Sequence, residues 1–460
     1  MQKIFAIAWL TWKAAVRFRL FLVIAVLLFL AVVGLPLIIK DDGTARGFTQ
    51  IILTYTLSSI TGLLGLSTLW IACGTLARDV EECQIQVLVT KPIARWQVWL
   101  GKWLGIVTLN AVLLALAGGC VYGLMMWRAG KLPAAEQEVL RTQVLVARGS
   151  AKMQDFSADI DQATERVLQE RLKSTPVEKV DVPEVRRQIH EGVKADFQLV
   201  PPSYQKSWVI DLGLAKNFLK GQPLQLRIKF NSAQRGGADA TYLGLWQVGV
   251  APRIWESQPM SLAPDTFHEF AIPADLFDDQ GRLTVTFVNR NDTPLLFPLG
   301  EGVEVLYPEG GFALNFARGL GIIFCWMGLL AALGLLAASF LSFPVAAFFS
   351  MGLLILGLSG DTLAESVGNG TVAAGNEETG QVGHTAVDGV LIPAFRGMLA
   401  VINLAQQSSP IDSLSTGRSI SWLELGTAFG QIVGLLGGSL AVIGILLFNR
   451  RELAGTQGTQ

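Results

Sequence analysis

The feature that most constrains this chain is a stretch of 42 residues, 319–360, that contains no Asp, Glu, Lys or Arg. As a single helix it would be roughly 60 Å long at about 1.5 Å per residue, twice the hydrocarbon thickness of a bilayer. Proline disfavours helical geometry in the residue before it, so Ser342, Phe343 and Pro344 predict a turn between two membrane spans. This stretch indicates a membrane protein.

Four further runs are long and apolar enough to cross a bilayer, which requires about 20 apolar residues. They are residues 20–39, 49–76, 103–127 and 425–449, and none of them contains a charged residue. The composition agrees, because 51% of the residues are hydrophobic and only 16% are charged. The sequence therefore predicts a polytopic α-helical membrane protein with six transmembrane helices.

Basic residues near the ends of the spans predict the orientation, because cytoplasmic loops carry the excess of Lys and Arg. The excess falls in the N-terminal segment, in the loop between the second and third spans, and after the last span. These basic residues are Lys3, Lys13, Arg17, Arg19, Arg78, Lys91, Arg95, Lys102, Arg450 and Arg451. We expect a multi-pass protein of the inner (plasma) membrane with both termini in the cytoplasm.

A helical stripe precedes the first predicted span. Phe5, Trp9, Trp12 and Val16 recur at helical spacing, with Lys3 and Arg17 on the flanks of the stripe. Tryptophan at headgroup depth beside basic residues is typical of a helix that lies along the membrane surface. The stripe predicts an interfacial helix, and the alternative is an extended start of the first span.

The predicted spans divide the chain into three parts. Residues 1–127 hold the interfacial helix, three spans and a cytoplasmic loop, and residues 128–311 form an inserted extracytoplasmic domain. Residues 312–460 hold the other three spans, an external loop at 361–424 and a short cytoplasmic tail. Within that loop, residues 390–404 are apolar but contain Pro393 and Arg396, which favours a surface or re-entrant helix over a seventh span.

The insert itself has two halves. Residues 134–197 are charge-rich with weak apolar periodicity, which predicts exposed helices. After residue 202 the pattern changes to period two, which is typical of half-buried strands. The expected strands are residues 208–212, 224–230, 267–272, 283–287 and 303–307, separated by turn residues. Together they predict an antiparallel β-sandwich.

The loop between the second and third spans, RDVEECQIQVLVTKPIARWQVWLGK, has charged residues around a short amphipathic pattern. Its predicted helix places four apolar residues on one face and ends before a Lys-Pro pair. Its residues of interest are Arg78, Asp79, Val80, Glu81, Glu82, Cys83, Val87, Leu88, Lys91, Pro92 and Arg95. Two interpretations stay open: a helix that a soluble partner contacts, or an ordinary solvated loop. After it, Trp96, Trp99, Lys102 and Trp103 predict anchors at the interface.

The sequence contains no motif for catalysis. A phosphate-binding loop needs a glycine five residues before its Gly-Lys pair and a Ser or Thr after it, and neither Gly101-Lys102 nor Gly130-Lys131 has them. The four cysteines and three histidines lack metal-site spacing. We therefore expect no enzymatic activity, no catalytic residue, no metal and no cofactor in this chain, and no nucleic-acid partner.

Three polar residues lie in or at the ends of predicted spans, namely Asn110, Asn315 and Arg318. Polar groups in this position either line a transport path or bind neighbouring helices and lipid headgroups. Both interpretations stay open.

The segment TLARDVEECQIQVLVTKPIARWQVWLGKWLG, with the terminal FNRRELA, resembles permease subunits of the type-2 ABC exporter (ABC-2 type) family. The resemblance covers residues 1–127 and 312–455. It implies a six-span permease that forms a homodimer or heterodimer in the bilayer and pairs with separate cytoplasmic ABC ATPase subunits. It also implies that residues 78–96 contact the ATPase. The large insert departs from the compact members of the family.

The resemblance leads to an expected function. The chain would form the translocation path of an ATP-driven exporter, while its partner subunits hydrolyse ATP. The alternative is a membrane-anchored ligand-binding or signalling scaffold without transport activity, which would need no ATPase beside it.

Overall fold

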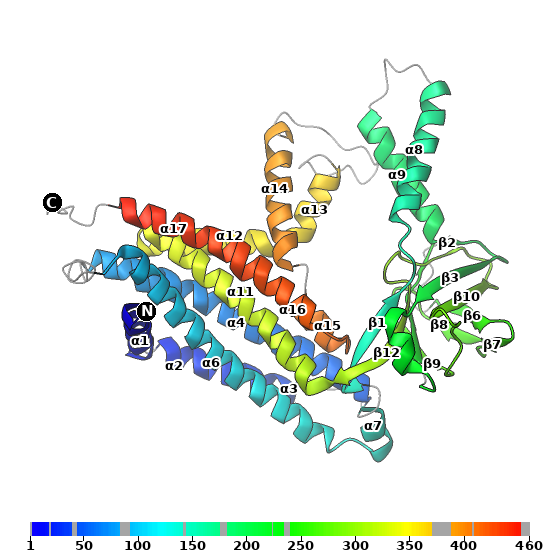
Figure 1. The fold of residues 1–460 in the computed structure, drawn as a ribbon, viewed down its shortest axis with the longest axis horizontal. Coiled ribbons are helices and arrows are strands. Elements are labelled where there is room, and N and C mark those ends of the chain that lie inside the picture. Colours follow the sequence, from blue (N-terminus) through cyan, green and yellow to red (C-terminus); the bar gives the residue numbers. More distant parts are fainter. Residues whose placement is uncertain are drawn as a thin grey trace. The chain divides into compact units, whose positions relative to one another are not determined.

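The computed structural model describes residues 2–17, 20–38, 44–82, 93–140, 144–174, 182–222, 224–233, 240–369, 388–406 and 409–451. The chain forms two compact units (Figure 1). The helical unit comprises Met1–Ala147 and Gly310–Gln460, and the β unit comprises Arg148–Glu309. Residues 128–147 therefore belong to the helical unit, although the sequence placed the start of the insert at residue 128.

The first part of the helical unit contains one long pair of helices preceded by shorter ones. Its elements are α1 (Gln2–Arg17), α2 (Leu20–Phe29), the π-helix η1 (Leu30–Gly34), α3 (Leu35–Ile38), α4 (Ala45–Glu81), α6 (Arg95–Ala129) and α7 (Ala134–Val139).

The second part follows the β unit in the sequence. Its elements are α11 (Phe312–Phe340), α12 (Phe343–Leu358), α13 (Gly360–Asn369), α14 (Asp388–Gln406), α15 (Pro410–Ser415), α16 (Trp422–Ala428), the π-helix η5 (Phe429–Gly437) and α17 (Gly438–Arg450). The chain leaves helical geometry at Leu341 and Ser342 between α11 and α12, and Pro344 lies in the first turn of α12. The predicted turn is confirmed.

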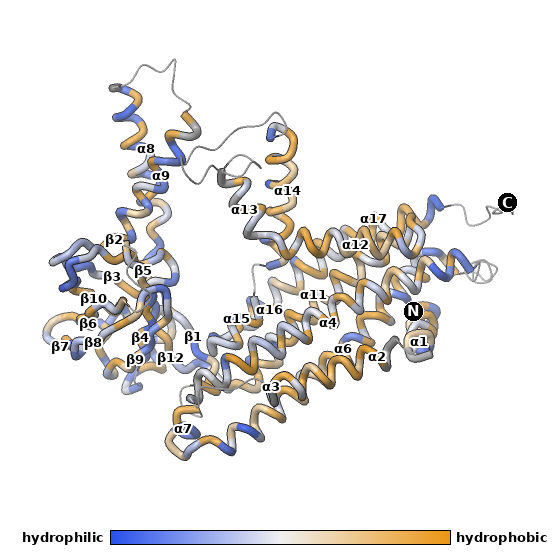
Figure 2. Tube along the Cα trace, turned by 180° about the vertical axis from the view of Figure 1, so that it is seen from behind, coloured by the Kyte–Doolittle hydropathy of each residue, from blue (hydrophilic) through white to orange (hydrophobic). Residues whose placement is uncertain are grey.

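Within the described residues, five helical stretches are long and apolar enough to cross a membrane: Thr49–Glu81, Arg95–Ala129, Phe312–Phe340, Asp388–Ser415 and Trp422–Arg450. Hydrophobic residues dominate the long helices of this unit (Figure 2). The first and fifth predicted spans appear as the shorter apolar helices Val23–Gly34 and Phe343–Leu358. The fourth stretch includes residues that the sequence favoured as a surface or re-entrant helix. The chain is thus an α-helical membrane protein, and the number of six spans stays a prediction.

The core of the helical unit lies where α11 packs on α4 and α6. Leu53, Leu57 and Leu64 of α4 are completely buried there, as is Ala331 of α11. Gly334 permits close approach of two helices, because a Cβ atom at this position would lie 2.6 Å from the Cβ of Ala72. Small residues at such crossings are typical of helix packing in membranes.

Helix α1 packs along the start of α6 through two glycines. A Cβ atom at Gly101 would lie 2.7 Å from the Cβ of Ile7, and one at Gly105 would lie 2.9 Å from the carbonyl oxygen of Ala8. The opposite face of α1 leaves Phe5 and Trp9 62% and 60% exposed. Helix α1 is thus amphipathic with part of its apolar surface exposed, and its place along a membrane surface stays a prediction.

The β unit holds helices α8 (Ser157–Ser174) and α9 (Val182–Gln198) and short turns of helix, η4 (Gly213–Ala215) and α10 (Lys216–Leu219). Its strands are β1 (Val146–Lys152), β2 (Leu199–Val200), β3 (Gln205–Asp211), β4 (Leu224–Ile228), β5 (Asn231–Ser232), β6 (Tyr242–Val250), β7 (Arg253–Glu256), β8 (Met260–Leu262), β9 (His268–Ile272), β10 (Arg282–Asn289), β11 (Leu295–Leu296) and β12 (Val303–Gly311). All five predicted strands are present. The other strands, β1, β2, β5, β6, β7, β8 and β11, were not predicted, and β1 lies in the segment that was predicted to be helical.

The strands form three sheets, with orders β1-β12-β4-β9, β3-β10-β6-β7 (where β8 also pairs with β6) and β2-β11-β5. Every pairing with a defined register is antiparallel, as in Val285 opposite Trp208 and Leu226 opposite Phe270. The two larger sheets share one apolar core that includes Leu226, Trp246 and Phe287. This arrangement is that of an antiparallel sandwich.

Charged side chains tie together the four strands of the first sheet. Arg227 on β4 contacts Glu304 on β12 at 3.1 Å and Glu269 on β9 at 2.7 Å. Arg148 on β1 contacts Glu269 at 2.8 Å, and Ser150 donates to Glu304 at 2.6 Å. These ion pairs are almost completely buried. Buried charges need a partner of opposite charge, and each pair supplies one.

Candidate functional site

The two helices that flank the predicted coupling loop leave fewer residues between them than the sequence indicated. Helix α4 continues to Glu81, so Arg78, Asp79 and Glu81 lie in its last turn, and Glu82 is its C-cap. Helix α6 begins at Arg95, where the side chain of Gln97 accepts a hydrogen bond from the amide of Ala94 at 3.2 Å. The helix of the second span is therefore longer than the predicted 49–76, and the loop is shorter. Cys83, Val87, Leu88, Lys91 and Pro92 lie outside the described residues.

An ion pair joins α4 to α6 beside this loop. The amine of Lys102 lies 2.5 Å from the carboxylate of Asp79 and donates to the carbonyl oxygen of Thr75 at 2.7 Å. The side chain of Lys102 is only 7% exposed. A charge that is buried to this degree needs its partner, because the desolvation cost is several kcal/mol per ion.

The structure corrects the prediction that Trp99, Lys102 and Trp103 anchor this helix at the membrane interface. Trp99 is completely buried, and the indole nitrogen of Trp103 donates to the carbonyl oxygen of Gly328 on α11 at 3.0 Å. Their helical spacing places them on one face, and that face packs against neighbouring helices. Trp96 is 43% exposed and so stays available at the surface.

The last turn of α4 holds the start of α12. A carboxylate oxygen of Glu81 accepts a hydrogen bond from the backbone amide of Phe343 at 2.9 Å. The guanidinium group of Arg78 lies 4.6 Å from the centre of the Phe343 ring. The first amides of a helix have no partner within the helix and carry partial positive charge, so a carboxylate there stabilises α12.

The first residue of α6 holds the end of α17. One guanidinium nitrogen of Arg95 lies 2.9 Å from each of three carbonyl oxygens, those of Phe448, Asn449 and Arg451. The last carbonyl groups of a helix are unpaired and carry partial negative charge, so a cation is well placed to bind them. Arg451 in turn donates to the carbonyl oxygen of Ala338 near the end of α11, at 3.1 Å.

The flanks of the loop therefore contact two helix ends from the second half of the chain, the start of α12 and the end of α17, and Arg451 joins the latter to the end of α11. We call the residues that make these contacts, Arg78, Asp79, Glu81, Arg95, Lys102 and Arg451, the helix-end cluster. Helix α1 packs on the same end of α6 and lies with the end of α17 at one end of the helical unit (Figure 1). The sequence indicated Arg78, Asp79, Glu81 and Arg95, but not the role of Phe343 and Arg451. A basic residue directly after a long apolar helix was the only sign of Arg451.

The three polar residues of the predicted path make contacts between helices. Asn110 donates to the hydroxyl of Thr68 on α4 at 2.8 Å. Asn315 donates to the carbonyl oxygen of Arg418 at 2.8 Å and accepts from the amide of Ile420 at 2.7 Å. Arg318 donates to the carbonyl oxygen of Ile420, and its guanidinium group lies 5.1 Å from the Trp422 ring. These contacts satisfy part of their polar groups, whereas Asn110 Oδ1 and Arg318 Nε are buried without a hydrogen-bond partner among the described residues. A path-lining role stays a prediction.

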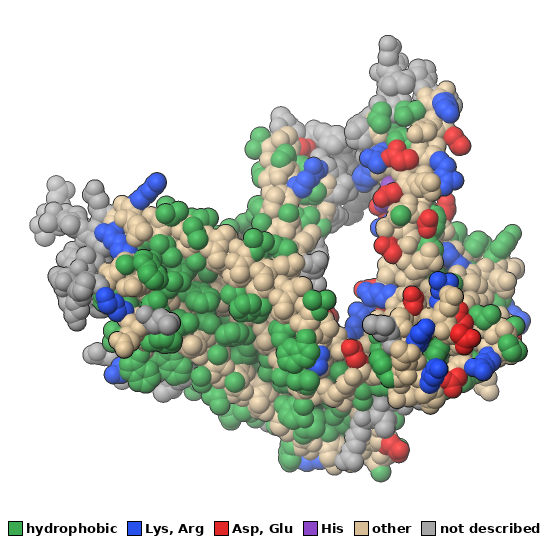
Figure 3. All heavy atoms as spheres, viewed as in Figure 1, with side chains coloured by type: hydrophobic (Ala, Val, Ile, Leu, Met, Phe, Trp, Pro, Cys, Tyr) green, Lys and Arg blue, Asp and Glu red, His purple; other side chains and the backbone are tan. Residues whose placement is uncertain are grey.

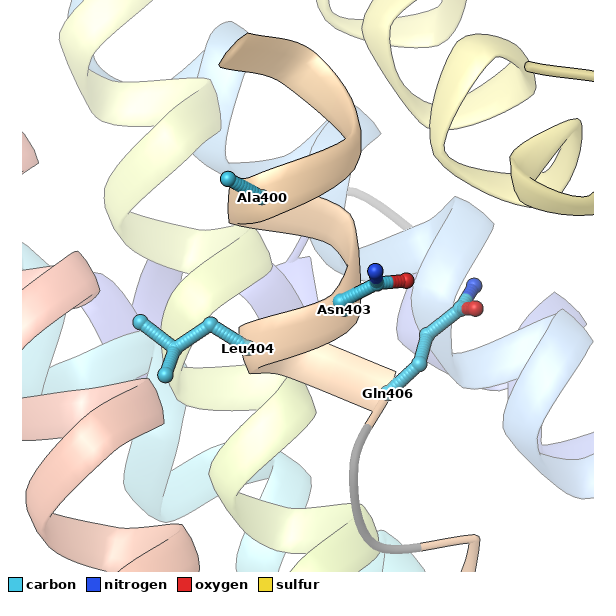
Figure 4. Close-up of a pocket in the computed structure, with 4 residues that line it drawn as sticks. All are labelled: Ala400, Asn403, Leu404 and Gln406. Carbon is cyan, nitrogen blue, oxygen red and sulfur yellow. The ribbon is translucent and has the colours of Figure 1, made fainter. Parts of the chain in front are cut away.

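The hollows on the described part of the helical unit include the following two. One of about 550 Å³ is lined by Ala400, Asn403, Leu404 and Gln406 on α14, where Asn403 and Gln406 point to one side of the helix and Leu404 to the other (Figure 4). The other, of about 660 Å³, is apolar and lined by Leu30, Ala31, Gly34, Leu35, Ser59, Gly62 and Leu63. Neither is lined by an ionisable side chain. Across the part of the chain that the structure describes, no three His, Cys, Asp or Glu residues are placed to hold a metal ion.

Comparison with known proteins gives one result for this region. Residues 5–149 match the family model described as ABC-2 family transporter protein. No curated protein and no solved structure matches the chain. The matched residues include α1, α4 and α6, and therefore both flanks of the loop. Over residues 5–149, the chain is thus similar to the ABC-2 family of transporter proteins.

Proposed function

We propose that this chain is the membrane-spanning permease subunit of an ATP-driven ABC exporter. It forms the translocation path and couples to separate cytoplasmic ATPase subunits through the loop between α4 and α6. The observation that carries this proposal is the family match over residues 5–149, which includes the whole loop. The chain acts as a homodimer or heterodimer of permeases, with residues 78–96 facing the ATPase.

The helix-end cluster supports coupling at this place. The loop is bounded by Glu81, which binds the start of α12, and by Arg95, which binds the end of α17. A push on such a loop reaches four helices at once, because packed helices move as rigid elements. A loop that was only solvated would need no contact of this kind on either flank.

The proposed orientation follows from the charges. The N-terminal helix, the start of α6 and the end of α17 carry a group of basic residues and lie at one end of the helical unit; this group includes Lys3, Lys13, Arg95, Lys102 and Arg450. The positive-inside rule favours the cytoplasm for this end. Because α6 begins at this end and the insert follows the other end of α6 in the sequence, the β unit is extracytoplasmic in this proposal. The charged residues visible on the β unit are of both signs, whereas hydrophobic side chains cover most of the visible face of the helical unit (Figure 3).

The experiment that tests the proposal is gentle purification of the chain from its native membrane, followed by mass spectrometry of the proteins that co-purify. We expect an ATPase subunit with a phosphate-binding loop. The variant Glu81→Lys/Glu82→Lys should lose that subunit, because both carboxylates are exposed on the loop flank. Glu136→Lys/Glu138→Lys on α7 is the matched control and should keep it.

Glu81 has two roles, and one more variant separates them. Glu81→Gln keeps an oxygen that accepts from Phe343 but removes the charge, so loss of the ATPase in this variant would show that the charge itself is recognised. If the unmodified chain yields no ATPase under several mild detergents, the permease proposal is wrong and the scaffold alternative takes its place.

A further inference from the structure

Arg95 occupies an unusual place in the helical unit. It is the first residue of α6, only a few positions after the loop, yet its contacts are with the end of α17, more than 350 residues further along the chain. One guanidinium nitrogen lies 2.9 Å from each of three carbonyl oxygens, so its two N–H groups are shared among them and hold that helix end in position.

The contact between the Arg95 guanidinium group and the α17 carbonyl oxygens is strong, but it can still be broken. A guanidinium group is always charged and offers five donors, and hydrogen bonds to a charged donor are roughly twice as strong as neutral ones. The acceptors are backbone carbonyls at the end of a helix, which lack partners within the helix, rather than a carboxylate. Arg95 itself is only partly buried, so water can replace it when the helices move apart.

The contact continues beyond α17. Arg451 directly follows α17, and its guanidinium group binds the carbonyl oxygens of Ala338 and Ser339 at 3.1 and 3.4 Å. Both carbonyls belong to the last turn of α11, which is the central helix of the unit by its contacts with α4, α6 and α17. One arginine thus links the loop to α17, and a second links α17 to α11.

On the basis of the proposed function, we propose that Arg95 is the positioning residue through which the coupling loop moves the last helix of the membrane portion. When the ATPase pushes the loop, the start of α6 carries the end of α17 with it. Without Arg95, α6 responds to the push and α17 does not. Arg95 acts through the α17 carbonyls and contacts neither nucleotide nor transported molecule.

The test measures the distance between the two helix ends in the complex with the co-purified ATPase. Spin labels are placed at Trp96→Cys and Asn449→Cys, both exposed positions, after replacement of the four native cysteines. In the unmodified background we expect one narrow distance distribution, both without nucleotide and with ATP plus vanadate. In Arg95→Gln we expect the distribution with ATP plus vanadate to become at least twofold wider.

Two variants make the result specific. Arg95→Lys keeps the charge and three donors, so it should restore the narrow distribution. Arg450→Gln also removes one positive charge beside the end of α17. Because Arg450 is exposed, this variant should leave the distance distribution narrow. A fold defect would widen the distribution in both nucleotide states, whereas loss of coupling widens it only with nucleotide.

The outcomes separate this inference from the proposed function. If Arg95→Gln retains the ATPase and keeps a narrow distribution in both nucleotide states, the role of Arg95 is wrong and the permease proposal stands. A distribution that is equally wide in both states would reduce Arg95 to a structural contact and also overturn the inference. If the unmodified chain binds no ATPase, both fail together.

Discussion

At the scale of single residues, the pair of Asp79 and Lys102 shows how a buried charge can be kept between membrane helices. The Lys102 side chain is 7% exposed, while that of Asp79 is 25% exposed. Removal of one partner leaves the other charge without compensation, and the cost depends on how far that remaining charge is from water. The two single substitutions should therefore differ in their effect.

We expect Asp79→Asn to lower the free energy of unfolding by about 3 kcal/mol, because it leaves the more deeply buried Lys102 uncompensated. Lys102→Met should cost less, since Asp79 keeps contact with water. The double variant Asp79→Asn/Lys102→Met should recover most of the loss. Unfolding in a detergent titration, followed by tryptophan fluorescence, measures all three. Equal losses in the two single variants would contradict this account.

At the scale of elements, the contact of α1 with α6 depends on two positions without side chains. The backbone of α1 approaches α6 so closely at Gly105 that a methyl group would lie 2.8 Å from the Cβ of Thr11 and 2.9 Å from the carbonyl oxygen of Ala8. At Gly119, further along the same helix, a methyl group would meet nothing within 4 Å. The same substitution at these positions should thus have opposite effects.

Gly105→Ala should destabilise the protein by about 1–3 kcal/mol, because the helices must separate to admit the methyl group. Gly119→Ala should be neutral or stabilising by up to about 1 kcal/mol, as alanine favours helix over glycine. Thermal unfolding followed by size-exclusion chromatography measures both. A loss of stability in Gly119→Ala that matches that in Gly105→Ala would show that close packing at Gly105 is not the cause.

Several elements with a strong local pattern were predicted from the sequence, although β6, whose residues alternate in burial, was missed. Contacts between helix ends were not predictable. The alternation of Leu224, Leu226 and Ile228 predicted β4, and Pro344 predicted the start of α12. Strand β1, VARGSAK, has no alternation of large apolar residues and was missed. The charges near residue 80 indicated a site, but the partners of Glu81 and Arg95 lie more than 250 residues away, and no local pattern encodes such a pairing.

At the scale of the whole molecule, the two units have separate cores. The largest apolar cluster of the helical unit draws only on residues outside 148–309, while that of the β unit draws only on residues inside this range. A unit with its own core has the means to fold alone. The helical unit should therefore tolerate loss of the insert.

We expect a chain in which residues 148–309 are replaced by a short Gly/Ser linker to remain a folded membrane protein. It should elute as a single symmetric peak in mild detergent and keep the ATPase that co-purifies with the full chain, since the helix-end cluster is untouched. Elution in the void volume would mean that the core of the helical unit depends on the β unit. Loss of the ATPase from a well-behaved peak would mean that the insert takes part in assembly.

The strand order β1-β12-β4-β9 places the last strand of the insert between the first strand and the others. Strand β1 begins at Val146, but its neighbour in the sheet begins only at Val303. During synthesis, more than 150 residues must follow the start of β1 before its neighbour β12 begins to be made. The sheet that contains Arg148 cannot be complete before then. Pairings between such distant segments form slowly, because the long loop between them must close first. The ribosome will therefore have begun α11 before this sheet is complete.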